Sequence, residues 1–441
     1  MLSSIRYFLA DLGHWLGRHW ALAGGAIALV AALGVGVYLL ASGGEDDVAN
    51  PAPEVVVREV AAPERPDELG FPAFATKNTT RNGSPSPPAT AAAAALAVFP
   101  STGGIPGPAA VSVVDAADWP AGIAAASLVA APVGAPLLVA EDGELGELGE
   151  SAIRELSPEG SARTDGSQVF ALGAAAGSTD LDELAVEGAN PAEVAARVLA
   201  LRARLAGKPE HIVVASSDDP AYAMPAASWA ARSGDPVLFV GRETVPDATA
   251  KALERHRGTP VYVLGPPTAI SAATLRRLER LAPTAERVGA EGAVTNAIEF
   301  ARFASGSFGW NINDPGHGFV IANGSRPLDA GAAAPLSASG TWGPLLVVED
   351  GEAVPAELRG YLLDLKPGYE DDPTRALYNH IWLIGDPSAI SVDFQAQVDE
   401  LAELVPVTSG PGTTGLVPGP GAVESSPDEP AGDGERDDQQ R

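Results

Sequence analysis

The sequence contains no cysteine, which excludes disulfide bonds, thiolate metal sites and a cysteine nucleophile. Lysine is scarce as well and occurs only at Lys77, Lys208, Lys251 and Lys366. Bases as a whole are outnumbered, because 28 lysines and arginines stand against 57 acids and give a net charge of −29. Such an acidic chain is repelled by phosphate backbones, so we do not expect nucleic acid as a partner.

Motifs of catalytic or cofactor chemistry are missing too. The six histidines show no metal-ligand spacing; they are His14, His19, His211, His256, His317 and His380. The glycine-rich run at residues 103–108 has the composition of a linker and matches no phosphate-cradling loop. We therefore expect a protein that is not an enzyme and that carries no cofactor.

The N-terminal region has the pattern of a membrane anchor. No charged residue occurs between Arg18 and Glu45, and about 20 apolar residues are enough for a helix that crosses a bilayer. We predict a transmembrane helix over residues 21–42, with the basic head of residues 1–20 in the cytoplasm and the remainder outside. A cleavable signal peptide is the alternative, since residues 41–43 (Ala-Ser-Gly) have the small-x-small pattern of a cleavage site.

Two further segments are poor in apolar periodicity. Residues 43–109 are rich in proline, alanine, serine and threonine, which indicates a semi-stiff linker. Residues 409–441 are rich in glycine, proline and acids, which indicates a disordered acidic tail.

Between these segments, one short pattern occurs three times: an apolar run that is entered through proline. The copies are Pro136, Leu137, Leu138 and Val139; Pro236, Val237, Leu238 and Phe239; and Pro344, Leu345, Leu346 and Val347. Such runs are typical of buried strands inside a parallel sheet. Further strands and helices alternate around each copy with short connections. We predict three tandem α/β units, at residues 110–207, 208–310 and 311–408, each a parallel sheet with helices on both faces.

The second unit shows the longest series of related motifs. They are residues 217–220 (Ser-Asp-Asp-Pro), 226–227 (Ala-Ala), 236–239 (Pro-Val-Leu-Phe), 261–265 (Val-Tyr-Val-Leu-Gly) and 269–271 (Ala-Ile-Ser). The third unit repeats the last three as residues 344–347, 381–385 and 389–391. The first unit keeps residues 118–120, 136–139 and 169–173.

In these motifs the chain resembles the type-2 cell-wall-binding repeats of Gram-positive surface proteins. The resemblance implies a flavodoxin-like fold for each repeat, three repeats around a pseudo-threefold axis, and non-covalent attachment to anionic wall polymers. Two departures bear on binding. No unit has the family's Pro-Ile-Leu-Leu unaltered, and its Gly-x-Asp-Arg-Tyr stretch is reduced to residues 289–292 (Gly-Ala-Glu-Gly) and 187–190 (Glu-Gly-Ala-Asn).

Charge distinguishes the units as partners for an anionic polymer. Residues 211–303 carry ten acids and ten bases, whereas residues 110–207 carry fifteen against five and residues 316–407 fourteen against four. We therefore expect polymer contact in the second unit, through its clustered arginines. They are Arg255, Arg257, Arg276, Arg277 and Arg280. Their spacing equally fits an ordinary solvated helix face.

Other polar clusters have two readings. Glu141 and Asp142, and likewise Glu349 and Asp350, follow the proline-led strands and are either solvated loops or weak sites for a divalent cation that bridges to polymer. Residues 216–219 (Ser-Ser-Asp-Asp) follow a strand, where they either cap a helix or meet a ligand. The proline-led runs are either buried strands or direct polymer contacts.

The sequence as a whole predicts a single-pass membrane protein of the bacterial cell envelope whose extracytoplasmic repeats bind a wall polymer. An extracytoplasmic scaffold that binds another protein is the first alternative, and large exposed apolar patches would favour it. A sugar- or phosphate-processing enzyme is the second, and a deep pocket with perturbed carboxylates would favour it.

Overall fold

The computed structural model describes residues 74–99, 107–175, 177–339, 342–370 and 372–407. The predicted head (1–20), transmembrane helix (21–42) and acidic tail (409–441) lie outside these residues. Within the described ranges, no helix has the length and apolar content needed to cross a membrane.

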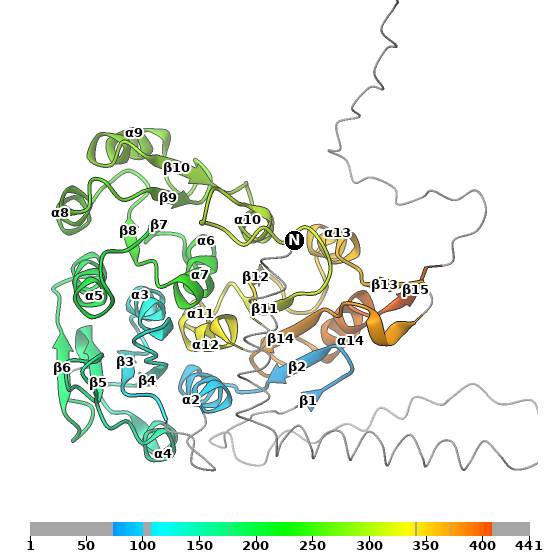
Figure 1. Cartoon of the computed structure of the whole chain (residues 1–441), viewed down its shortest axis with the longest axis horizontal. Coiled ribbons are helices and arrows are strands. Elements are labelled where there is room, and N and C mark those ends of the chain that lie inside the picture. The colour runs from blue at the N-terminus through cyan, green and yellow to red at the C-terminus, as the bar shows by residue number, and fades with distance from the viewer. Residues whose placement is uncertain (1–73, 100–106, 176, 340–341, 371, 408–441) are drawn as a thin grey trace, which may run out of the picture. The chain divides into compact units, whose positions relative to one another are not determined.

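Three sheets, one centred in each predicted unit, form the core of the described chain (Figure 1), and all their strands pair in parallel except β1, which is antiparallel to β2. The first contains β3 (Val111–Asp115), β4 (Leu137–Ala140), β5 (Val169–Leu172) and β6 (Glu183–Val186). The second contains β7 (Ile212–Ser216), β8 (Val237–Val240), β9 (Val261–Leu264) and β10 (Ala285–Val288). The third contains β11 (Gly318–Asn323), β12 (Leu345–Val348) and β14 (His380–Ile384), together with β1 (Phe74–Ala75) and β2 (Thr79–Asn82). A separate pair, β13 (Gly368–Tyr369) and β15 (Val405–Pro406), forms a small parallel sheet.

Helices alternate with these strands, as the sequence predicted. The first unit has α3 (Trp119–Val129), α4 (Gly146–Leu156) and α5 (Pro191–Ala206). The second has α6 (Pro220–Ala223), α7 (Pro225–Ser233), α8 (Asp247–Arg255), α9 (Ala272–Leu281) and α10 (Ala293–Arg302). The third has α11 (Leu328–Ala332), α12 (Ala334–Ala338), α13 (Ala356–Asp364) and α14 (Val392–Leu401), and α2 (Pro87–Val98) follows β2.

Local chemistry sets where several helices begin. Asp118 caps α3 by accepting a hydrogen bond from the Ala121 backbone at 3.0 Å. Ser271 and Ser391, at the same place in the second and third units, cap α9 and α14 through bonds of 3.2 and 3.1 Å to the third residue of each helix. Proline divides the helix after the first strand, because Pro225 opens α7 and Pro335 lies at the start of α12.

The proline-led strands lie at an edge of each sheet and not inside it. The sheet orders are β4-β3-β5-β6, β8-β7-β9-β10 and β12-β11-β14-β2-β1. These edges are nevertheless buried, since helices cover them. At β12, the Leu345 backbone N–H donates to the Ser228 hydroxyl of α7 at 3.0 Å, and at β8 the Phe239 carbonyl accepts a bond from Thr249 at 2.7 Å. Covered edges explain why proline at the strand entrance is tolerated.

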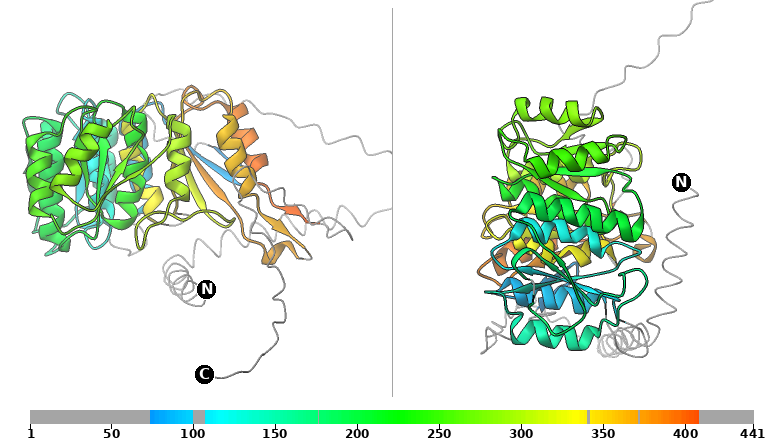
Figure 2. Two further views of the ribbon diagram at one scale, coloured as in Figure 1. Left: turned by 90° about the horizontal axis from the view of Figure 1, so that it is seen from above. Right: turned by 90° about the vertical axis from the view of Figure 1, so that its left-hand side faces the viewer.

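The prediction of a linker over residues 43–109 is wrong for residues 74–99. Strand β2 pairs in parallel with β14, in a register that sets Thr79 opposite Ile381 and Arg81 opposite Leu383. In Figure 1 and in the left view of Figure 2, the blue β2 lies among the orange strands of the third unit. The middle of helix α2 is buried, with Ala91 to Ala95 at most 1 % exposed. Polar β2 and alanine-rich α2 have the composition of a linker, but alanine packs closely between neighbouring elements.

The added strand has the same place in its sheet as β6 and β10 have in theirs. The helices that follow these strands also make equivalent contacts: α5 packs against β8 and α8, α10 against β12 and α13, and α2 against β4 and α4. Each unit is therefore joined to the next by the same kind of helix, and α2 joins the third unit to the first.

The helices that follow the first strand of each sheet meet at the centre. Helix α3 contacts α7 and α11, and α12 contacts α7 (Figure 1). Glycine permits the closest of these approaches: a methyl group at Gly331 of α11 would lie 2.6 Å from the carbonyl oxygen of Gly122 in α3. The three units thus share one core, in which small side chains set the distance between helices.

Candidate functional site

The proline-led runs themselves present no side chain to a ligand. Leu137, Leu138 and Val139 of β4 are at most 1 % exposed, as are Val237, Leu238 and Phe239 of β8 and Leu345, Leu346 and Val347 of β12. Pro136, Pro236 and Pro344 are buried as well. Their position supports the interpretation as core strands and leaves no exposed surface for direct polymer contact in this conformation.

The clustered arginines of the second unit lie on a solvent-facing surface. Helices α8 and α9 contact each other, and each buries one face: Ala252 and Leu253 in α8, Thr274 and Leu278 in α9. The opposite face of α9 carries Arg276, Arg277 and Arg280, which are exposed. We refer to these three arginines, together with the exposed Arg255 and Arg257 at the end of α8, as the α8–α9 basic surface.

No ion pair neutralises the α8–α9 basic surface within the described residues. Arg280 instead donates to the Arg276 carbonyl at 3.0 Å. Nearby, the pKa of His256 is lowered by partial burial and by the positive charges of Lys208 and Arg255. Burial is the larger cause of this shift, and the two basic neighbours add to it.

The acidic loops do not form a metal site. Glu141, Asp142, Glu349 and Asp350 are all exposed. The Asp350 carboxylate accepts the backbone N–H of Glu352 at 2.8 Å, which closes the turn locally. No group of three acidic or histidine side chains that could hold a metal ion occurs in the described part of the chain.

The polar residues that follow β7 are occupied in shaping the backbone. The Ser216 hydroxyl accepts the backbone N–H groups of Asp218 and Asp219 at 3.2 and 3.1 Å. The Asp218 carboxylate accepts the backbone N–H of Arg242, at the start of the neighbouring loop, at 2.7 Å. These bonds hold the loop between β7 and α6 in shape and argue against a ligand site in the Ser-Ser-Asp-Asp run. Asp219, at the N-cap of α6, makes no side-chain capping bond, so the helix-capping interpretation is not confirmed.

The third unit differs at the equivalent position. Arg326 precedes Pro327 where the second unit has Asp219 before Pro220, and its Nε lies 2.7 Å from the Asp329 carboxylate. Asp329 is fully buried in α11, and burial raises its pKa to about 6 in spite of Arg326. In the first unit, burial likewise raises the pKa of Asp118. These shifts belong to carboxylates within the helix-packed core and not to an open cleft.

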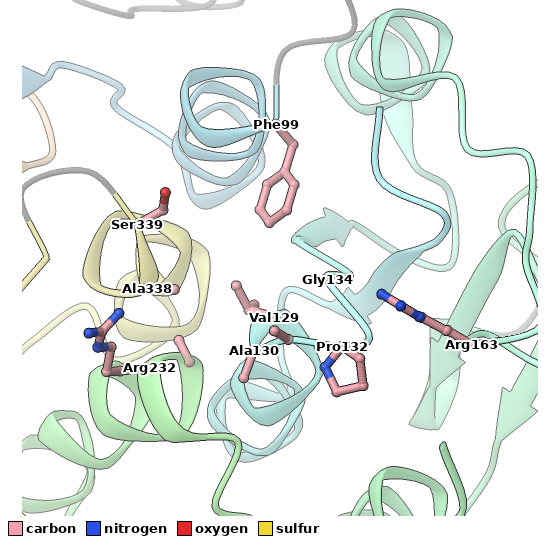
Figure 3. Close-up of a pocket in the computed structure, with 11 residues that line it drawn as sticks. Phe99, Val129, Ala130, Pro132, Gly134, Arg163, Arg232, Ala338 and Ser339 are labelled. Atoms are coloured by element: carbon pink, nitrogen blue, oxygen red, sulfur yellow. The ribbon is translucent and has the colours of Figure 1, made fainter. Parts of the chain in front are cut away.

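Three helix ends enclose a cavity of about 320 Å³ (Figure 3). The ends of α3, α7 and α12 contribute Val129, Arg232 and Ala338, and the ring of Phe99 points into the space between them. Arg163 approaches from the first unit, and the guanidinium of Arg232 lies 4.2 Å above the Trp342 ring. The volume is at the lower end for ligand pockets, and the lining combines four alanines and one proline with two arginines, without a carboxylate or histidine.

The repeats are similar to those of known proteins. The family model of cell wall binding domain 2 (CWB2) matches residues 185–275. The chain therefore contains a CWB2 repeat, as the sequence motifs predicted. Two solved structures from Clostridium difficile are similar: Cwp8, with a TM-score of 0.56 and 18 % identity, and Cwp6, with 0.55 and 16 %. Each comparison covers 74 % of this chain, and the match spans only about half of the neighbours, 52 % of Cwp8 and 48 % of Cwp6. At this identity the likeness is one of fold. No curated protein matches the sequence.

The boundaries of the CWB2 match differ from the boundaries of the units defined by the sheets. It begins within β6, the last strand of the first sheet, and ends within α9. The matched segment therefore starts with a strand and a helix that complete the preceding unit. The same frame applied to the whole chain begins one repeat at β2, the next at β6 and the last at β10. In that frame the first repeat would begin inside the alanine-rich segment that the sequence analysis assigned to a linker.

Proposed function

We propose that this protein is a membrane-anchored component of the bacterial cell envelope whose three CWB2 repeats bind an anionic wall polymer without a covalent bond. The CWB2 match over residues 185–275 carries this proposal. The threefold-equivalent contacts made by α2, α5 and α10 support the pseudo-threefold arrangement that the resemblance implies. Membrane attachment through residues 21–42 rests on the apolar run in the sequence.

Polymer contact, in this proposal, occurs at the α8–α9 basic surface. The first and third units carry a large excess of acids and repel polyanions, whereas the second unit is neutral overall and presents five exposed arginines on two adjoining helices. Because the proline-led strands are buried, the approach of an extended polymer is limited to helix faces and loops. Exposed, unpaired arginines at such a face attract phosphate or carboxylate groups over about 10 Å at physiological salt.

Co-sedimentation with cell-wall sacculi tests both parts. The soluble piece should begin at residue 70, so that β1, β2 and α2 are retained. We expect binding to untreated sacculi and loss of binding after anionic polymers are stripped. Sensitivity to EDTA would show that a divalent cation takes part in binding. Failure to bind untreated sacculi would overturn the proposal.

A matched pair of charge reversals tests the surface. Changing Arg276, Arg277 and Arg280 to Glu should weaken binding about tenfold or more, since each lost contact is worth about 0.2–1 kcal/mol and repulsion is added. The control changes Arg154, Arg359 and Arg375, exposed arginines of the outer units, to Glu and alters net charge equally. Equal weakening in both variants would contradict a local contact.

One observation favours a protein partner as the alternative. The large apolar side chains that are most exposed in the described residues all belong to the third unit: Leu363, Leu377, Tyr378, Val392 and Val407, at 46–60 % exposure. A protein-binding scaffold would keep its affinity for stripped sacculi, lose it after protease treatment of the sacculi, and be weakened by Leu377→Ser.

A further inference from the structure

The second unit brings together a serine, a histidine and an aspartate that are far apart in sequence. His211 directly precedes β7, Asp235 precedes β8, and Ser307 lies in the turn after α10. The His211 Nδ1 is 3.1 Å from the Asp235 Oδ2, and the His211 Nε2 is 3.3 Å from the Ser307 Oγ. The order carboxylate, imidazole, hydroxyl is that of an activated nucleophile, with each ring nitrogen assigned to one partner.

The aspartate is held in a fixed orientation. Its Oδ1 accepts the backbone N–H of His211 at 3.0 Å, and its Oδ2 accepts the indole N–H of Trp229 at 2.9 Å. Asp235 is 3 % exposed and His211 is 8 % exposed, so water reaches neither side chain freely. A carboxylate oriented in this way favours the tautomer with a proton on Nδ1, which leaves the Nε2 lone pair directed at Ser307.

Aromatic rings fix the imidazole from the sides. Tyr262 and Phe308 make edge contacts with His211, at centroid distances of 5.7 and 5.4 Å. Tyr262 and Phe308 also stack on each other at 3.7 Å. The imidazole therefore has little freedom to turn away from the hydroxyl, which is the preorganisation a general base requires.

Ser307, in contrast, is exposed, in a tight turn where Ser305 and Phe308 exchange backbone hydrogen bonds. The backbone N–H groups of Gly306 and Ser307 donate to no acceptor within the described chain. They are the donors nearest in sequence to the hydroxyl and are free to stabilise negative charge on a carbonyl oxygen attacked there.

We propose that Ser307 is a nucleophile, with His211 as its general base and Asp235 as the residue that positions the base, and that it acts on carboxylic esters carried by an extended polymer. The cavity of Figure 3 is lined by other residues, and the turn itself is exposed, so a small free ester would find few enclosing walls. An ester on a polymer held by the repeats would instead be presented to the turn. This choice of substrate rests on the proposed function; the reactivity of Ser307 does not.

The chemical step uses only groups on the protein, the ester and water. The Ser307 Oγ forms a bond to the ester carbonyl carbon while its proton passes to the His211 Nε2. The bond to the alkoxy oxygen then breaks, and the departing alcohol takes that proton. Water attacks the acyl-serine with the same help from His211, which releases the acid and restores the serine. The net reaction is ester plus water to acid plus alcohol.

Labelling of the full chain with a fluorophosphonate probe tests the nucleophile independently of polymer binding. We expect the probe on the peptide that contains Ser307 and a loss of labelling in Ser307→Ala, which alters only an exposed turn. Ser305→Ala, two residues away, is the matched control and should label as the wild type does. Equal labelling of the wild type and Ser307→Ala would overturn the proposal.

Two further measurements separate an activated serine from an exposed one. A folded Asp235→Asn variant, checked by circular dichroism, should label at least about tenfold more slowly than the wild type, because the base loses its orienting carboxylate. Urea-unfolded wild type should also lose the label. Labelling that survives unfolding would overturn the proposal even if that variant fails to fold. If Ser307 labels but sacculi are not bound, the proposed function fails while the nucleophile stands.

Discussion

The three strand–helix pairs that complete the sheets occupy equivalent places, but they differ in where they lie in the chain relative to the other strands of their sheet. The pairs β6–α5 and β10–α10 follow their own sheets and lead directly into the next unit, whereas β2–α2 joins the third sheet from the beginning of the described chain. The partners of β2 in β14 are about 300 residues away in sequence. Geometry is thus conserved among the three pairs, while connectivity is not.

The side-chain hydrogen bonds that anchor the three strands decrease in number from β2 to β10 to β6. At the register position of Arg81 in β2, β10 has Arg287 and β6 has Ala185. Arg81 donates to the Gly385 and Ser391 carbonyls and to Gln395, and it is 2 % exposed. Arg287 donates to the Gly265 and Ile270 carbonyls and is half-buried. The pair with the least help from connectivity therefore has the most extensive side-chain anchoring.

Removal of the β2–α2 pair should have the largest effect. A chain that begins at residue 100 leaves β14 with an open edge and exposes the faces of β4 and α4 that α2 covers. We expect it to lose cooperative unfolding and to aggregate, since an uncovered edge strand pairs with other chains. Size-exclusion chromatography and thermal unfolding measure this.

The control for that truncation begins at residue 72 and retains β1, β2 and α2. Adding a peptide of residues 72–99 to the shorter chain should restore the unfolding transition of the longer one. Normal folding of the shorter chain alone would show that the third sheet does not depend on its distant strand.

Arginine-to-methionine changes should have intermediate and unequal effects. Arg81→Met leaves two carbonyls and one amide oxygen without their donor in a buried site, which should cost about 3 kcal/mol or more. Arg287→Met leaves two carbonyls at a half-buried site and should cost about 1–2 kcal/mol. Urea unfolding of both variants measures the difference. Equal costs would mean that the anchoring of β2 is no stronger than that of β10.

An effect that appears only as a change with pH should come from Asp329→Asn in α11, the helix against which α2 packs. The native pKa of about 6 lies above the ordinary value of 3.8. The folded state therefore binds the proton more tightly, so this group lowers the free energy of unfolding as pH rises from about 4 to about 6. The increase in pKa corresponds to a loss of about 3 kcal/mol at most in the free energy of unfolding.

In Asp329→Asn this pH-dependent loss should be absent. The stability difference between the wild type and Asp329→Asn should then shift in favour of the variant on going from pH 4 to pH 7. A difference that stays constant across this window would show that Arg326 keeps the native carboxylate ionised throughout.

Sequence alone predicted the elements whose signals are local. The proline-led runs coincide with β4, β8 and β12 to within one residue. Local signals could not show that these strands lie at sheet edges, because helices from neighbouring units cover those edges. Nor could they reveal β2, since Thr79–Asn82 is polar and its pairing partner is distant.

The candidate site was predicted only where its residues are close together in the sequence. Arg276, Arg277 and Arg280 have the spacing of one helix face, and the structure places them on one. His211, Asp235 and Ser307 lie before two different strands and in a turn, with no spacing that links them, so only the fold brings them into contact. Sequence reasoning had therefore assigned His211 no chemical role.

The β2–α2 pair, which joins the third unit to the first, also constrains how such a gene can change in length. In an open array, a repeat can be gained or lost at an end with the loss of one interface. Here each repeat supplies a strand to its predecessor, and the first supplies one to the last. Deleting the middle repeat would leave two sheets to close around a centre shaped by three sets of helices, in which Gly122 and Gly331 already touch. Variation in repeat number should therefore proceed by whole sets of three.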